Sequence, residues 1–163
     1  MKNKPRIVVY YNNDEIPSYV RDQILDLSDK ASCNLASKYR KLNIGRSLSL
    51  SNKNGHFDDN DGLYIVSVLG RNENTKVVGY LHYFNDQSDD FIPKAVCIHN
   101  IWIEPEYRKL GIGSEMVRKL INELGSGRQF FISVLSNNKE GLAFWKKLGF
   151  ITPEYTTYYL NSY

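Results

Sequence analysis

The first half of the chain changes from an extended to a helical pattern and then becomes polar. Residues Arg6 to Tyr11 are mostly β-branched or aromatic and predict a strand, which the turn residues 12 to 14 end. From Pro17 to about Lys41 apolar residues recur near helical spacing, so we expect one helix, or two with a break near Ser28. The segment from Leu42 to Gly62 is polar, and we expect a long loop that is either a specificity element or a solvated insertion.

The second half of the chain alternates between apolar strands and amphipathic helices. The strands are expected over Leu63 to Leu69, Lys76 to Phe84, Lys94 to Ile103, Gln129 to Leu135 and Tyr155 to Leu160. The helices are expected over Ser114 to Leu124 and Lys139 to Leu148. Gly125 and Gly149 follow these helices as end signals. The resulting order β-α-β-β-β-α-β-α-β predicts an α/β (α+β) fold.

Composition favours a soluble, single-domain protein. The 163 residues suit one domain over 1–163, and no apolar run is long enough for a signal peptide or a membrane span. A net charge of +3 comes from scattered basic residues, so nucleic acid is not an expected partner. Cys33 and Cys97 have no metal-ligand spacing, and we expect reduced core thiols, no metal site and a cytoplasmic protein.

The segment from Ile101 to Ser114 contains the chemistry most specific to this chain. It joins an apolar strand, a turn, a glycine-rich stretch and a helix start. Glycines let backbone N–H groups approach a ligand, and the first turn of a helix presents unpaired amide hydrogens at the positive end of the helix dipole. These features suit a diphosphate, although a lone Gly-x-Gly after a strand is more often a tight turn.

Two motifs resemble those of the Gcn5-related N-acetyltransferase (GNAT) superfamily. The spacing Arg108-x-x-Gly111-x-Gly113 is similar to its pyrophosphate-binding motif, and Asn138 followed by a helix that ends in Gly149 is similar to its second signature. The order and separation of the motifs also agree with that family. The resemblance implies a mixed, mostly antiparallel sheet of six to seven strands, flanked by about four helices, with strands 4 and 5 splayed apart.

The resemblance implies transfer of an acetyl group from acetyl-CoA to a primary amine by direct attack in a ternary complex. It assigns the pantetheine arm to the fourth strand and to Asn138, and the pyrophosphate to the glycine-rich stretch, with a charge-assisted contact from Arg108. The implied cofactor-binding residues are Ile101, Trp102, Ile103, Arg108, Lys109, Leu110, Gly111, Ile112, Gly113, Ser114 and Asn138.

The catalytic residues are less clear from the resemblance. Trp145 stands where many family members carry a Tyr that protonates the leaving thiolate, and an indole cannot serve as that acid. His99 is the candidate general base, because its ordinary pKa suits proton removal near neutral pH, but a core histidine is the alternative. His82, Glu104 and Tyr155 are candidate acceptor-binding residues.

The expected partner is a small-molecule or peptide amine, with no nucleic acid or membrane, and the protein is expected to be a monomer or homodimer. A second hypothesis is a non-catalytic GNAT-fold module that senses acyl-CoA, which the departure at Trp145 makes conceivable. A third, a nucleotide-binding protein, lacks the Gly-Lys-Ser/Thr ending that phosphate loops require.

Overall fold

The computed structural model describes residues 4–11, 15–38, 63–86, 95–125 and 127–152. Its contacts divide the chain into a first unit, 1–132, and a second unit, 133–163, and each is described by itself. The loop expected over 42–62 and the closing strand expected over 155–160 lie outside the described residues.

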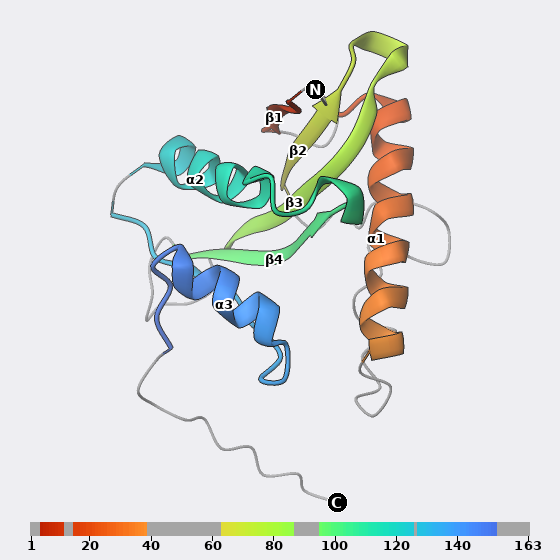
Figure 1. Cartoon of the computed structure of the whole chain (residues 1–163). Helices are drawn as coiled ribbons and strands as arrows, with labels where there is room; N and C mark the ends of the chain where they lie inside the picture. Colours follow the sequence, from red (N-terminus) through yellow and green to blue (C-terminus); the bar gives the residue numbers. More distant parts are fainter. Residues whose placement is uncertain (1–3, 12–14, 39–62, 87–94, 126, 153–163) are drawn as a thin grey trace, which may run out of the picture. The chain divides into compact units, whose positions relative to one another are not determined.

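The first unit is built on a five-stranded sheet in the order β1-β2-β3-β4-β5 (Figure 1). Its strands are β1 (Arg6–Tyr10), β2 (Leu63–Leu69), β3 (Lys76–Asp86), β4 (Ala95–Ile103) and β5 (Phe130–Phe131). The first four strands pair antiparallel, and β5 pairs parallel to β4. The mixed, mostly antiparallel sheet is therefore confirmed, with five strands in the described part of the chain where six to seven were expected.

The strand predicted over Gln129 to Leu135 is wrong in length. Only Phe130 and Phe131 form β5, opposite Val96 and Cys97. Within the first unit, β5 therefore pairs with only the first part of β4, and the later residues of β4 have no β5 partner. An apolar run reports burial, whereas a strand also needs a neighbour for its backbone groups, and that neighbour is not visible in local sequence.

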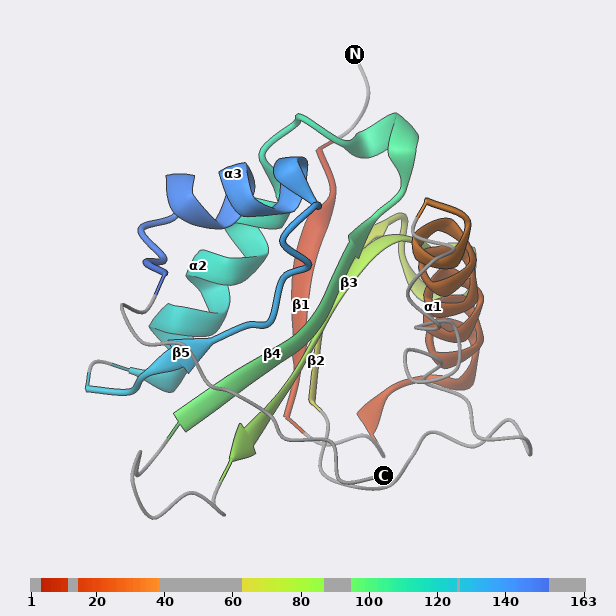
Figure 2. The same ribbon diagram turned by 90° about the horizontal axis from the view of Figure 1, so that it is seen from below.

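The helices α1 (Ser18–Lys38) and α2 (Ile112–Leu124) cover opposite faces of the sheet (Figure 2). The helix α1 is continuous through Ser28, so the break considered there does not occur. Ser28 is buried, and α1 turns a row of buried apolar residues toward the sheet: Val20, Ile24, Leu27 and Ala31. This spacing is that of one helix face, which accounts for the unbroken helix.

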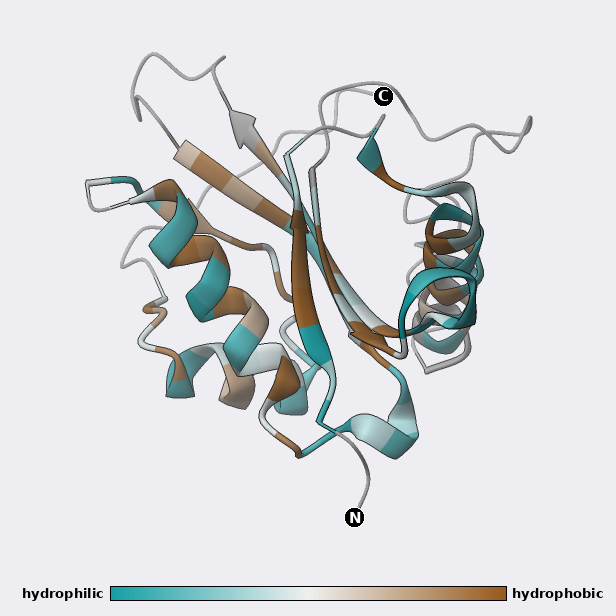
Figure 3. Ribbon diagram, turned by 90° about the horizontal axis from the view of Figure 1, so that it is seen from above, coloured by the Kyte–Doolittle hydropathy of each residue, from teal (hydrophilic) through white to brown (hydrophobic). Residues whose placement is uncertain are grey.

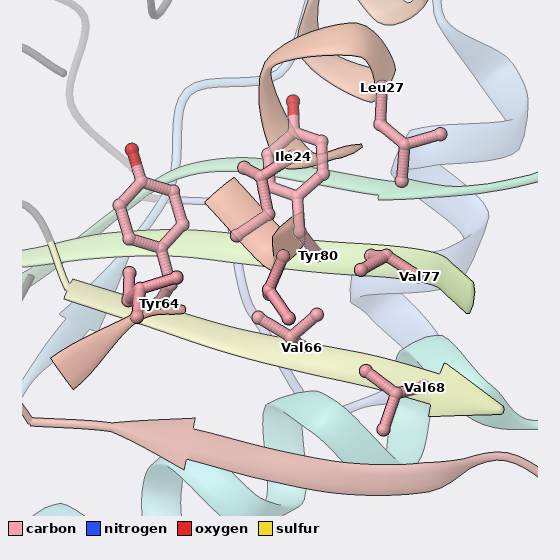
Figure 4. Packing of buried hydrophobic residues seen from close by; sticks show 9 residues of the cluster. Ile24, Leu27, Tyr64, Val66, Val68, Val77 and Tyr80 are labelled. Carbon is pink, nitrogen blue, oxygen red and sulfur yellow. The ribbon is translucent and has the colours of Figure 1, made fainter. Parts of the chain in front are cut away.

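The core between α1 and the sheet is a single apolar cluster. Ile24 and Leu27 of α1 pack over Val66 and Tyr64 of β2 and over Tyr80 of β3 (Figure 4). The strands are largely hydrophobic, whereas both helices also carry hydrophilic residues (Figure 3). Burial of this apolar surface fixes which side chains of β2 and β3 lie on the α1 face.

The helix α2 packs on the other face through four buried side chains: Ile112, Met116, Val117 and Leu120. It begins at Ile112, before the expected Ser114, because Gly111 adopts a left-handed backbone as its N-cap. It ends at Gly125, whose N–H donates to the Ile121 carbonyl. Amphipathic spacing thus predicted the helix correctly, and only its first turn was missed.

The second unit contains the helix α3 (Lys139–Lys147), close to the predicted bounds. Asn138 caps it, since its side-chain oxygen accepts a hydrogen bond of 3.1 Å from the Gly141 N–H. Trp145 is buried, with the rings of Phe144 and Phe150 each 4.9 Å away and edge-on.

Candidate active site

A β-bulge lies in the middle of β4. His82 of β3 pairs with Asn100, but Tyr83 pairs with Ile98, so His99 is an extra residue without an opposite partner. A bulge bends its strand locally and redirects side chains, and such irregularities are frequent beside active sites. The pairing pattern thus sets His99 apart from every other residue of β4.

Four aromatic rings gather around this bulge, and we call Tyr64, His82, Phe84 and His99 the imidazole cluster. The His82 ring stacks on Tyr64 at a centroid distance of 4.7 Å and an interplanar angle of 8°. The His99 ring meets His82 edge-on at 5.3 Å and lies 5.8 Å from Phe84. Because Tyr64 belongs to the core beneath α1, the cluster lies on the α1 face of the sheet.

The two histidines of the cluster differ in their surroundings. Burial, together with the smaller effect of the neighbouring His99, lowers the pKa of His82 to about 3. Its Nδ1 atom is buried and has no hydrogen-bond partner among the described residues. His99 is exposed as a residue, but the partial burial of its ring also lowers its pKa below the ordinary value. Both imidazoles are therefore neutral near pH 7.

The end of β4 is shaped by a close approach to β3. Gly79 lies opposite Ile103, and a Cβ at Gly79 would come within 2.5 Å of the Ile103 Cδ1 and 2.9 Å of the Trp102 carbonyl oxygen. The Arg108 guanidinium lies 4.5 Å over the Trp102 ring, and its Nε donates a hydrogen bond of 2.8 Å to the Ile103 carbonyl. Gly79 thus allows β3 to approach the last residues of β4 closely, and the Arg108 side chain contacts the same residues.

The glycine-rich stretch after β4, the predicted anion cradle, forms an open turn at the start of α2. A short 3-10 turn (Pro105–Tyr107) leads to Lys109 at φ 61° and Gly111 at φ 81°. The first hydrogen bond of α2 runs from the Glu115 N–H to the Gly111 carbonyl, so the N–H groups of residues 112 to 114 have no acceptor within the helix. A Cβ placed on Gly111 would meet nothing within 4 Å. These features fit a diphosphate.

The acidic residues beside the cradle both have lysine partners. Glu104 lies 3.0 Å from the Lys30 ammonium of α1, and Glu106 lies 3.0 Å from Lys76 of β3. The sequence raised the possibility that Glu104 attracts a cationic amine. In this structure its charge is already compensated, so such an attraction is weakened.

The remaining predicted residues are placed as follows. Asn138 and Trp145 belong to the second unit, and the structure gives them a capping and a packing role there. Tyr155 lies outside the described residues. Cys33 is exposed and Cys97 half-buried, so the expectation of two core thiols was wrong for Cys33. Among the described residues, no group of three or more potential ligands forms a metal site, and no helix is long and apolar enough to cross a membrane.

Sequence reasoning missed one residue that shapes the site and the backbone conformation of another. Gly79 appeared only as one residue of a strand, although a glycine within a strand often marks a close backbone approach. Lys109 was among the implied cofactor-binding residues, but its left-handed backbone was not foreseen, because residue type does not encode such a conformation at a lysine.

Comparison with known proteins decides the family. The family model described as "Acetyltransferase (GNAT) family" matches residues 39–150, which is more than half of the chain. The chain belongs to the GNAT family of acetyltransferases. Among curated proteins, this GNAT protein is similar to the thialysine N-epsilon-acetyltransferases of Bos taurus, 34% identical over 88 residues, and of Mus musculus, 33% identical over 88 residues. Each match covers 52% of this chain and 51% of the relative, so the chain spans about half the length of the curated relatives it matches.

Solved structures share the fold of this GNAT protein. A mutant of the BH1408 protein from Bacillus halodurans has a TM-score of 0.66 at 15% identity and covers 97% of this chain and 99% of its own. An aminoglycoside acetyltransferase, meta-AAC0020 from an uncultured soil metagenomic sample, in complex with sisomicin, has a TM-score of 0.60 at 15% identity, with coverage of 99% and 97%. At these identities the likeness concerns the fold alone.

Proposed function

We propose that this GNAT protein transfers an acetyl group from acetyl-CoA to a primary amine by direct attack within a ternary complex. The observation that carries the proposal is the continuity of two features in the first unit. The part of β4 that β5 leaves unpaired runs directly into the anion cradle at the start of α2. A ligand with an amide-bearing arm and a diphosphate matches both features.

The donor site would use backbone groups rather than charged side chains. Ile101, Trp102 and Ile103 would pair with the pantetheine arm as an additional strand would. The N–H groups at the start of α2 would bind the diphosphate, because three of them lack helical acceptors and the helix dipole favours negative charge. Lys109, Leu110 and Arg108 are exposed at the rim of the same cradle. The Asn138 side-chain amide remains a proposed contact for the arm.

His99 is the proposed general base. An ammonium acceptor must lose a proton before its nitrogen lone pair attacks the thioester carbonyl, and a neutral, exposed imidazole is able to take that proton. The C–N bond forms first and the carbonyl oxygen becomes an oxyanion, and the nitrogen then loses its second proton. Collapse of the oxyanion restores the C=O bond and breaks the C–S bond, and coenzyme A leaves as a thiolate that is then protonated. A backbone N–H near the β4 bulge would stabilise the oxyanion while it forms.

No acid is assigned to the leaving thiolate. Trp145 at the usual tyrosine position is buried between two rings and offers only an N–H donor. A thiol of ordinary pKa is a tolerable leaving group near neutral pH without a dedicated acid. This substitution is also the feature that favours the second hypothesis, an acyl-CoA sensor without turnover.

The relatives support an amine as the acceptor. One relative is named for an ε-amine of thialysine and a structural neighbour was solved with the aminoglycoside sisomicin, so amines of both kinds belong in a first acceptor screen. The imidazole cluster, with His82 on the α1 face, is the proposed place for the acceptor. Glu104 and Tyr155 remain candidates for its rim.

The decisive experiment is calorimetric titration with acetyl-CoA of the wild type and of two variants at Gly113. Gly113→Asp places a carboxylate in the first turn of α2, which favours the helix but repels a diphosphate, so the variant should fold and lose most of its affinity. Gly113→Ala is the control and should retain affinity and stability. Equal affinity of the aspartate variant would reject the donor site. Release of free coenzyme A with an amine then separates an enzyme from a sensor.

A further inference from the structure

The imidazole cluster contains a histidine to which the proposed chemistry assigns no proton transfer. We propose that His82 is a positioning residue, whose ring holds the His99 imidazole at the β4 bulge in the orientation that receives the proton of the acceptor amine. The inference rests on the proposed function, in which His99 is the base. It adds a role for a side chain of β3 that the chain's family motifs do not include.

The His82 ring is itself fixed by its neighbours. Its ring lies flat on Tyr64, whose side chain is only 2% exposed and belongs to the core beneath α1. Phe84, two residues further along β3, meets the same imidazole edge-on at 6.1 Å. Because the His82 ring stacks on the buried Tyr64 and contacts Phe84 at its edge, it has little freedom to rotate.

The His99 ring depends on His82 and Phe84 for its orientation. At the bulge it lacks an opposite residue on β3, so no cross-strand pair aligns it. Among the described residues, its ring contacts are with His82 at 5.3 Å and with Phe84 at 5.8 Å. Without these ring contacts an exposed histidine would sample several rotamers. A general base must stay within hydrogen-bond reach of the proton that it removes, so such averaging would slow the reaction.

His82 also remains uncharged beside His99. His82 has a buried Nδ1 without a partner among the described residues, so a proton there would create a buried cation with no compensating group. His82 therefore stays neutral and does not repel an imidazolium at His99. Lys30 of α1 pairs with Glu104, and no described charged group of α1 contributes to the lowered pKa of either histidine. Burial alone lowers the pKa of His99, without a charged neighbour.

The test is a proton NMR titration of the full chain, which contains three histidines, at positions 56, 82 and 99. Replacing each in turn assigns its imidazole resonance. In the wild type His99 should titrate below its ordinary pKa, and His82 should remain neutral to well below pH 5. In His82→Leu, which keeps apolar bulk but removes the flat ring, the pKa of His99 should rise toward the ordinary value. The acidic limb of the kcat/KM profile should move by the same amount.

His82→Phe is the matched control, because it restores a flat ring and removes both nitrogens. It should retain the lowered pKa of His99 and the acidic limb of the wild-type kcat/KM profile, whereas His82→Leu should move both and lose about tenfold or more in kcat/KM. An unchanged His99 titration and an unchanged acidic limb in His82→Leu would overturn the proposal. If that variant does not fold, the wild type decides: a nuclear Overhauser contact between the two rings and a single His99 rotamer support the proposal, and rotamer averaging overturns it.

The two arms separate this inference from the proposed function. The titration of His99 is read in the free protein and needs no acetyl transfer. A wild type that neither binds acetyl-CoA nor releases coenzyme A would reject the proposed function, whatever the titration shows. Acetyl transfer with a His99 pKa insensitive to His82→Leu would reject only the positioning role.

Discussion

Gly79 of β3 and Ile103 at the end of β4 face each other so closely that a methyl group at position 79 would lie 2.5 Å from the Ile103 Cδ1. The same methyl group would lie 2.9 Å from the Trp102 carbonyl oxygen. Side-chain atoms can move aside at such distances, but a backbone oxygen moves only with its strand. The absence of a side chain at Gly79 therefore sets the path of the strand proposed to bind pantetheine.

Gly79→Ala should displace the end of β4. We expect a loss of unfolding free energy of about 1–3 kcal/mol from overpacking, together with weaker acetyl-CoA binding. Urea unfolding and calorimetry measure the two effects. Ile103→Val removes the Cδ1 atom, so the double variant should recover part of the loss. Strict additivity of the two substitutions would contradict the proposed contact.

Lys109→Gly should stabilise the protein. Lys109 holds φ at 61°, a conformation that costs an L-residue about 1–2 kcal/mol, and glycine avoids that cost but loses about 0.5–1 kcal/mol of chain entropy. The expected net gain is a few tenths to about 1 kcal/mol in urea unfolding. Lys109→Ala removes the charge equally but keeps a Cβ, so it should show no gain. A stability ranking with alanine at or above glycine would argue against backbone strain.

His82 should make the stability of the fold depend on pH. Its pKa is about 3 in the folded protein and near the ordinary 6.5 when unfolded, so the unfolded chain binds more protons between these values. Stability should therefore fall as the pH drops from about 6.5 toward 3, by up to about 1.4 kcal/mol per pH unit. Unfolding of the wild type and of His82→Phe at several pH values isolates this contribution. Parallel pH dependences would exclude a buried neutral His82.

Replacing Lys30 should leave the Glu104 carboxylate without its ion-pair partner. The pair is partly exposed, with side-chain exposures of 58% and 19%, so Lys30→Met should cost no more than about 1 kcal/mol of stability. At low salt the freed carboxylate should lower KM for a cationic amine, and the double variant with Glu104→Gln should cancel that gain. A KM that is identical in all three proteins would show that Glu104 does not face the acceptor.

Elements that depend on local periodicity were predicted well. The bounds of β2 agree with the expected strand, and α3 agrees within one residue, because hydrophobic spacing reports which face of each element is buried. The glycine motif likewise indicated the cradle at the start of α2, since its geometry is set by neighbours in sequence. The length of β5 was wrong, because strand pairing depends on a partner more than thirty residues away in the chain.

The same contrast between local sequence and tertiary structure holds for the candidate site. Residue types and spacing alone determined the family resemblance, the anion cradle and His99 as a titratable group on a strand next to it. Only the tertiary structure decided that β4 bulges at His99, that His82 from another strand packs against it, and that Lys30 compensates Glu104. The physical reason is that register, stacking and ion pairing are relations between distant segments, which a linear pattern of side chains does not specify.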